Sequence, residues 1–175
     1  MARKQNYREA IKHRDDLTGE HRLGDAGQFL FALVFAAVWI SDTFIFQYTT
    51  CLNNYVPGFI RIPIGIVLLL ISSYLVITGL SIVFGEKREE PVVIRKSVFN
   101  MVRHPIYLSE ILLYLGLLMF SISLASVIVC LFAFLFLHAI SRYEEKLLRV
   151  RFGEAYDAYM REVPMWIPRL VKKGE

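Results

Sequence analysis

The sequence predicts an all-α membrane protein: a polytopic helical domain with about four transmembrane helices, a C-terminal helix hairpin and a cytoplasmic amphipathic extension. Hydrophobic residues make up 55% of the 175 residues and charged residues only 21%, a composition typical of membrane proteins. The apolar residues occur in long runs, and the cations are concentrated between these runs. Because no internal repeat or separate soluble unit is visible, we expect a single domain over residues 1–175.

The first half is expected to contain a polar segment and two spanning helices. Residues 1–27 are polar and charged, and they are predicted to lie in the cytoplasm. Residues 28–48 and 59–84 are apolar, and at about 1.5 Å per residue each run can cross roughly 30 Å of hydrocarbon. The sequence therefore predicts two transmembrane helices joined by a short outer loop.

The second half is expected to contain a hairpin of two further helices. An apolar run over 105–120 is followed by the polar stretch SISLAS and by a second apolar run over 125–140. Polar, turn-compatible residues between two such runs indicate a tight connection. The fourth helix is predicted to continue beyond the bilayer and to stop at Phe152 and Gly153, where a short amphipathic segment follows.

Lysine and arginine residues orient the predicted helices. Six precede the first helix, five lie between the second and third, and eight follow the fourth, whereas only Arg61 lies on the other side. By the positive-inside rule the side with nineteen cations is the cytoplasm, so both termini of this multi-pass protein are predicted to be cytoplasmic. The net positive charge indicates topology and attraction to anionic headgroups. We expect no nucleic-acid partner, because the sequence shows no soluble basic face.

The segment before the third helix combines an extended apolar patch with a polar doublet. Residues 91–94 read PVVI, and extended backbone at the membrane surface offers N–H and C=O groups to a ligand. Pro105 fits the first position of a helix, which places His104 at the cap. The start of that helix carries partial positive charge, which suits a carboxylate or a phosphate. The alternative is that Arg103 and His104 only anchor the helix to headgroups.

The segment after the fourth helix carries paired acids and aromatic residues. Glu144 and Glu145 stand where the helix is expected to leave the bilayer, and Tyr156 and Tyr159 recur one helical turn apart. The stretch VPMWIP then supplies a Trp between two prolines, which suits the membrane interface. The usual interpretation of an isolated glutamate pair is a solvated helix face.

Taken together, the two segments resemble a known family. Arg-His-Pro-x-Tyr at 103–107, Glu-Glu-x-Leu-Leu-x-x-x-Phe-Gly-x-x-Tyr-x-x-Tyr at 144–159 and Val-Pro at 163–164 are similar to motifs of the integral-membrane methyltransferases. That superfamily includes isoprenylcysteine carboxyl methyltransferases and phospholipid N-methyltransferases. The resemblance covers residues 85–168, which are therefore predicted to form the cofactor-binding catalytic portion.

The resemblance implies S-adenosyl-L-methionine as the cofactor, and a lipid or lipidated acceptor that reaches the site from the membrane bilayer. It implies no metal ion and no particular oligomeric state. The cofactor needs an anion for its ammonium, donors for its carboxylate and an apolar wall for its adenine. The positions that match the family's cofactor contacts are Val93, Ile94, Phe99, His104, Tyr107 and Glu144.

Arg103 and Glu110 are the predicted catalytic residues. Glu110 is an ionisable group inside a predicted transmembrane helix, and such groups are functional candidates. A general base there suits an amine acceptor, which must lose a proton before it is methylated, whereas a carboxylate acceptor needs no base. The alternative is a structural role for Glu110, with Arg103 or His138 as its partner.

Three other functions stay open at this point. Isoprenylcysteine carboxyl O-methylation is one, although Ile140 falls where those enzymes place a substrate-binding arginine, and Arg142 lies two residues on. A sterol-reductase-like enzyme that uses NADPH has a distantly similar C-terminal hairpin. A non-catalytic membrane interaction protein would explain the helices and the charges but not the spaced motifs.

Overall fold

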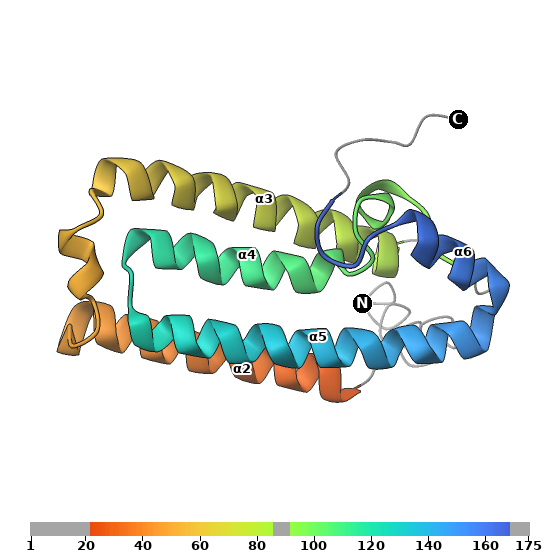
Figure 1. The fold of residues 1–175 in the computed structure, drawn as a ribbon, viewed down its shortest axis with the longest axis horizontal. Helices are drawn as coiled ribbons and strands as arrows, with labels where there is room; N and C mark the ends of the chain where they lie inside the picture. The colour runs from red at the N-terminus through yellow and green to blue at the C-terminus, as the bar shows by residue number, and fades with distance from the viewer. Residues whose placement is uncertain (1–21, 86–91, 169–175) are drawn as a thin grey trace, which may run out of the picture.

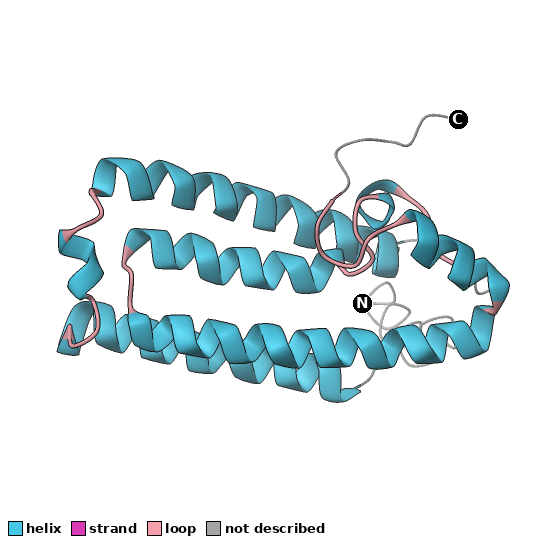
Figure 2. Ribbon diagram, in the orientation of Figure 1, coloured by secondary structure: helices cyan, strands magenta, loops and turns pink. Residues whose placement is uncertain are grey.

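The computed structural model describes residues 22–85 and 92–168, and within these residues the chain is helical without a strand (Figures 1 and 2). The predicted all-α fold class is therefore confirmed. The helices are α2 (Arg22–Ile40), α3 (Gly58–Gly85), α4 (Pro105–Phe120), α5 (Leu124–Phe152) and α6 (Glu154–Glu162). A π-helical turn, Ser41–Phe46, extends α2, and short 3₁₀ turns occur at Cys51–Asn54 and Ser97–Asn100.

Three helical stretches are long and apolar enough to cross a membrane: Gly24–Phe46, Gly58–Gly85 and Leu124–Phe152. The remaining long helix, α4, is apolar but has only 16 residues, which give about 24 Å of helix. A polytopic helical domain is therefore confirmed, whereas four crossings remain a prediction.

The first helix begins earlier than the apolar run predicts. α2 starts at Arg22 rather than near residue 28, so part of the segment predicted as a polar N-terminus is helical. This early part of α2 packs closely on α5, because a Cβ on Gly27 would fall 2.1 Å from the Phe136 ring and a Cβ on Gly24 would fall 3.1 Å from Ile140. The rest of that predicted segment, up to residue 21, lies outside the described residues.

The four long helices lie side by side, and consecutive helices run antiparallel (Figure 1). α3 packs along α4, and α2 packs along α5. One end of the bundle, here called the polar end, holds residues 92–104 and 142–168. The opposite end, here called the loop end, holds residues 47–57 and 121–123. The predicted hairpin of α4 and α5 is confirmed, and so is the break at Gly153.

Glycine permits the close contact between α3 and α4. A Cβ on Gly65 would fall 3.0 Å from the carbonyl oxygen of Gly116, and a Cβ on Gly116 would fall 2.8 Å from Leu69. Small residues let helices approach closely in a bilayer, where packing rather than the hydrophobic effect drives helix association. Farther toward the polar end, Ser72 Oγ donates to the carbonyl oxygen of Ser109 at 2.6 Å. α4 is therefore held against α3 at two positions along its length, the glycine contact and the serine hydrogen bond.

A buried arginine joins three segments at the loop end. The guanidinium of Arg61 donates to Asn53 Oδ1 and to the carbonyl oxygens of Val56, Met119 and Phe120, at 2.8–3.3 Å. Met119 and Phe120 are the last residues of α4, where unpaired carbonyls make a cation favourable. Arg61 is the one cation that the sequence places on the outer side, and its hydrogen bonds cap the C-terminal end of α4.

Asp42 belongs to the same end. Its carboxylate accepts hydrogen bonds from the backbone N–H of Thr49, at 3.1 Å, and from the Thr49 hydroxyl. The carbonyl oxygen of Thr49 in turn accepts from the N–H of Leu124 at 3.1 Å. The loop after α2 is thereby tied to the start of α5.

Candidate functional site

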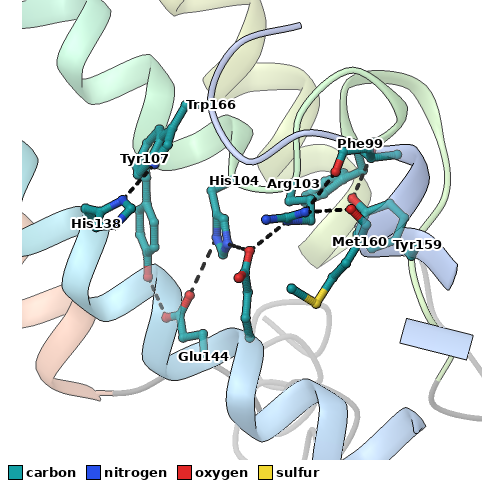
Figure 3. A network of polar contacts seen from close by, with 11 residues as sticks. Phe99, Arg103, His104, Tyr107, His138, Glu144, Tyr159, Met160 and Trp166 are labelled. Carbon is teal, nitrogen blue, oxygen red and sulfur yellow. Dashed lines mark hydrogen bonds and ion pairs between the residues drawn. The ribbon is translucent and has the colours of Figure 1, made fainter. Parts of the chain in front are cut away.

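The start of α4 places the first polar segment of the site. Pro105 occupies the first helical position, where its missing N–H costs no hydrogen bond, and His104 is the N-cap residue, as predicted. The His104 side chain makes no capping bond and points toward α5 (Figure 3). The backbone N–H of Arg103 donates to the carbonyl oxygen of Pro164 at 3.0 Å, which ties this segment to the chain after α6.

Arg103 bridges α4, α5 and the chain around the end of α6 (Figure 3). Its Nε donates to Glu145 Oε1 at 2.7 Å, and its Nη1 donates to the carbonyl oxygens of Met160 and Val163 at 3.0 and 2.9 Å. The Glu145 side chain is 3% exposed, and that of Arg103 is 11% exposed. Charge-assisted bonds at this depth are screened far less than a surface ion pair.

His104 and Tyr107 meet the two glutamates of α5. His104 Nε2 lies 3.2 Å from Glu145 Oε1, and His104 Nδ1 lies 3.9 Å from Glu144 Oε2. The Tyr107 hydroxyl donates to Glu144 Oε1 at 2.6 Å, and the His104 and Tyr107 rings stack with their centroids 5.7 Å apart. The structure therefore brings together three of the residues predicted for the cofactor.

The charge of this cluster follows from its burial. Burial lowers the pKa of His104 below its usual value, although the Glu145 carboxylate opposes the shift. His104 is therefore neutral at pH 7, with one ring nitrogen as donor and the other as acceptor. Glu144 and Glu145 are both buried beside His104, and the guanidinium of Arg103 pairs with Glu145.

Aromatic rings lie beside these polar contacts. Trp166 Nε1, after α6, donates to His138 Nδ1 on α5 at 3.1 Å (Figure 3). The Trp166 ring centroid lies 5.4 Å from that of Phe134 and 6.2 Å from that of His104. The tryptophan predicted for the membrane interface therefore packs between α5 and the start of α4.

The loop before α4 supplies apolar surface at the polar end. Val93 packs against the buried tyrosines of α6, whereas Ile94 and Phe99 pack against buried residues of α3. The Tyr159 hydroxyl donates to the carbonyl oxygen of Phe99 at 2.6 Å, which fixes the loop on α6 (Figure 3). The structure thus places these three predicted residues on the loop that leads into Arg103.

Glu110 does not join the contacts around His104. It lies three residues beyond Tyr107 on α4, is 6% exposed, and accepts a hydrogen bond from the Tyr114 hydroxyl on the same helix. Its other oxygen, Oε2, is buried and has no hydrogen-bond partner among the described residues.

The described contacts of Arg103 and His138, the alternative partners of Glu110, are to other residues. Arg103 precedes the helix cap and binds Glu145, and His138 accepts the hydrogen bond from Trp166. Both side chains are therefore engaged at the polar end, whereas Glu110 lies farther along α4 toward the middle of the bundle.

Glu145 and Trp166 are contacts that the sequence motifs did not assign. Adjacent helical residues point about 100° apart, so a helix face predicts only one of two neighbouring glutamates at a site. Both glutamates are used here because Arg103 and His104 are also adjacent and approach α5 together. In the sequence, the occurrence of two adjacent pairs, Arg-His and Glu-Glu, could have indicated that Glu145 also belongs to the site.

Comparison with known proteins adds one finding. A family model described as phospholipid methyltransferase matches residues 53–155, which include α3, α4 and α5 with Arg103, Tyr107 and Glu144. No curated protein and no solved structure matches the chain.

Proposed function

Because the chain belongs to the phospholipid methyltransferase family, we propose that it transfers a methyl group from S-adenosyl-L-methionine to a lipid or lipidated acceptor in the bilayer. The family and the membrane-spanning helices support a membrane methyltransferase. One observation carries the finer proposal: side chains from the start of α4 meet the paired glutamates of α5 in a buried cluster. Its members are Arg103, His104, Tyr107, Glu144 and Glu145.

The residues present fit the charge of S-adenosyl-L-methionine. That molecule carries an ammonium, a sulfonium and a carboxylate, so its net charge is positive. Its ammonium suits the buried carboxylate of Glu144, which lies beside His104 and accepts the Tyr107 hydrogen bond. A buried carboxylate favours a cationic group over an anionic one.

We assign each predicted cofactor residue a role. Glu144 holds the ammonium, and Tyr107 orients that carboxylate through its 2.6 Å hydrogen bond. His104 and the first N–H groups of α4 meet the ligand's carboxylate. When bound, S-adenosyl-L-methionine supplies an electrophilic methyl group on its sulfur. The adenosine lies against the loop residues Val93, Ile94 and Phe99.

The two predicted catalytic residues act differently in this proposal. Methyl transfer is an in-line displacement that depends on alignment and on exclusion of water. Arg103 serves alignment as a positioning residue, because it holds Glu145 and the chain around α6 in place. Glu110 accepts the proton that an ammonium acceptor must lose before its nitrogen lone pair can attack.

We also propose that the polar end faces the cytoplasm and that α4 is a transmembrane helix, so that the protein crosses the membrane four times. Among the described residues, every Lys and Arg except Arg61 lies at the polar end or, in the case of Arg22, at the start of α2 on the same side of the bundle (Figure 1). The positive-inside rule assigns such an end to the cytoplasm.

Binding of S-adenosylhomocysteine to the protein in detergent tests the cofactor proposal, with NADPH as the competing ligand. We expect the wild type to bind S-adenosylhomocysteine and not NADPH. His104→Ala and Glu144→Gln should each weaken binding by more than the ~0.5–1.5 kcal/mol of an ordinary hydrogen bond, because each meets a charged group. Glu154→Gln, at an exposed position of α6, is the matched control. Wild-type affinity in both site variants, with intact folding, would remove these residues from the site.

A further inference from the structure

The chain after α6 runs past the candidate site as an irregular segment. α6 ends at Glu162, and residues 163–168, here called the strap, contain no helical turn. The strap is attached at two places, to Arg103 near its start and to His138 through Trp166 (Figure 3). It therefore connects the segment before α4 with α5.

The attachment near the start of the strap is strong. The guanidinium of Arg103 donates to the carbonyl oxygen of Val163 at 2.9 Å, and the backbone N–H of Arg103 donates to that of Pro164 at 3.0 Å. Val163 is 6% exposed and packs with the buried tyrosines of α6. A charge-assisted bond, a backbone bond and a buried side chain together fix this end of the strap.

The attachment at Trp166 is weaker. Among the described residues, residues 165–168 are tied to the bundle by one hydrogen bond, from Trp166 Nε1 to His138 Nδ1 at 3.1 Å. A ring nitrogen that accepts a hydrogen bond belongs to a neutral histidine, so this bond joins two uncharged groups. Trp166 is half-buried, and the next residue, Ile167, is 80% exposed. This end of the strap can therefore detach while the Arg103 end stays in place.

Detachment of Trp166 would uncover the site. Its ring centroid lies 6.2 Å from that of His104 and 5.4 Å from that of Phe134. His104, which is only 8% exposed, stacks on Tyr107. Trp166 thus packs beside the side chain that we place at the carboxylate of the ligand.

We propose that the hydrogen bond between Trp166 and His138 is a latch, which must break before the methyl donor enters the site or its product leaves. The inference rests on the proposed function and concerns how fast these ligands exchange. Trp166 acts through the position of the strap beside His104, so it is a positioning residue. Because the latch holds the strap with or without a ligand, its loss should speed entry and release by the same factor and leave Kd nearly unchanged.

The kinetics of S-adenosylhomocysteine binding to the protein in nanodiscs test the latch. Trp166→Phe keeps an aromatic ring but deletes the N–H donor, so the association and dissociation rate constants should each rise roughly twofold to tenfold, the effect of one hydrogen bond. His138→Phe should give the same acceleration. The double variant should exchange no faster than either single variant, because all three lack the same bond.

Trp39→Phe is the matched control. Trp39 Nε1 donates to the carbonyl oxygen of Ser121 at the loop end, also at 3.1 Å. The same substitution therefore deletes an equivalent hydrogen bond at the opposite end of the bundle. Both rate constants should stay at their wild-type values.

A second measurement needs no ligand. The chain contains two tryptophans, so Trp166 is the single tryptophan in a Trp39→Phe background. Adding His138→Phe removes the acceptor of the latch, and iodide should then quench the fluorescence of Trp166 more strongly. Equal quenching with and without His138→Phe would overturn the latch.

The kinetic outcomes separate the latch from other roles. Wild-type rate constants in Trp166→Phe would overturn the proposal. Faster release with unchanged entry would also overturn it, because that result identifies Trp166 as a direct ligand contact. Failure of the wild type to bind S-adenosylhomocysteine would instead overturn the proposed function, and iodide quenching would then decide the latch.

Discussion

The guanidinium of Arg103 donates hydrogen bonds to Glu145 on α5 and to the carbonyl oxygens of Met160 and Val163 around the end of α6. Breaking a buried ion pair by removing one partner typically costs about 3–5 kcal/mol, because the other charge is left uncompensated. The hydrogen bonds of Arg103 hold Glu145 and the chain around the end of α6 together.

Replacing Glu110 with Gln tests its role as a base. The change keeps size and polarity but deletes the proton acceptor, so methyl transfer to an amine should fall by roughly 10²–10⁴-fold, while binding of S-adenosylhomocysteine survives. Incorporation of labelled methyl into phosphatidylethanolamine nanodiscs measures the rate. Glu162→Gln on α6, whose side chain is 63% exposed, is the control. A near wild-type rate in Glu110→Gln would end the general-base proposal.

The buried His104 predicts how stability depends on pH. Its pKa is lowered in the folded protein from the 6.5 of an exposed histidine, so the unfolded chain binds more protons as the pH falls below about 6.5. The stability contributed by neutral His104 is complete above that pH and is lost as the pH falls through the folded-state pKa. The melting midpoint in detergent should therefore decrease from pH 7 to pH 5, and less so in His104→Gln. If the melting midpoints of the wild type and of His104→Gln decreased equally between pH 7 and pH 5, the assignment to His104 would be contradicted.

The sequence could predict part of the site at this scale. The spacing of Arg-His-Pro-x-Tyr and Glu-Glu pointed to His104, Tyr107 and Glu144, and the structure brings these side chains together. It could not predict that Trp166 reaches His138, because that contact depends on how the chain turns back after α6. Contacts made by a loop that folds back over a bundle leave no periodic pattern.

Helix packing gives a prediction at the scale of elements. A Cβ at Gly65 would fall 3.0 Å or less from the neighbouring α4 atoms, so Gly65→Ala should force α3 and α4 apart and cost about 1–3 kcal/mol of stability. Gly58→Ala at the start of the same helix is the matched control, because its Cβ would meet nothing closer than 3.8 Å. Thermal unfolding in one detergent compares the two. Equal midpoints would show that α3 and α4 adjust at no cost.

Apolar runs predicted the positions of the long helices well, but not their ends or their contacts. Hydrophobicity marks the part of a helix that can lie in hydrocarbon, whereas α2 begins at Arg22, before the apolar run, in a part where its glycines pack against α5. Sequence patterns also fail to predict the contacts of Arg61, the cation that lies on the opposite side from the others in the charge count. Its carbonyl partners on α4 become visible only when the helices are placed side by side.

Cysteine labelling tests the topology of the whole molecule. Cys51 is exposed at the loop end and Cys130 is buried, so a membrane-impermeant maleimide added to sealed cells should label Cys51. In a Cys51→Ser background, which keeps only the buried Cys130, a cysteine introduced at Lys12 or Lys172 should be labelled only after lysis. Labelling of either terminal probe in sealed cells would reverse the proposed orientation.

The arginine cap at the loop end has a consequence for biogenesis. Synthesis proceeds from the N-terminus, so α3 leaves the ribosome before the carbonyls of Met119 and Phe120 exist to receive the Arg61 guanidinium. Until then this cation has only Asn53 and Val56 nearby in the chain, and a poorly paired cation crosses hydrocarbon at a high cost. We expect α3 to reach its final depth only together with α4, as a pair released late by the translocon. The last step in the membrane insertion of α3 would then coincide with the first tertiary contact, which is the contact between Arg61 and α4.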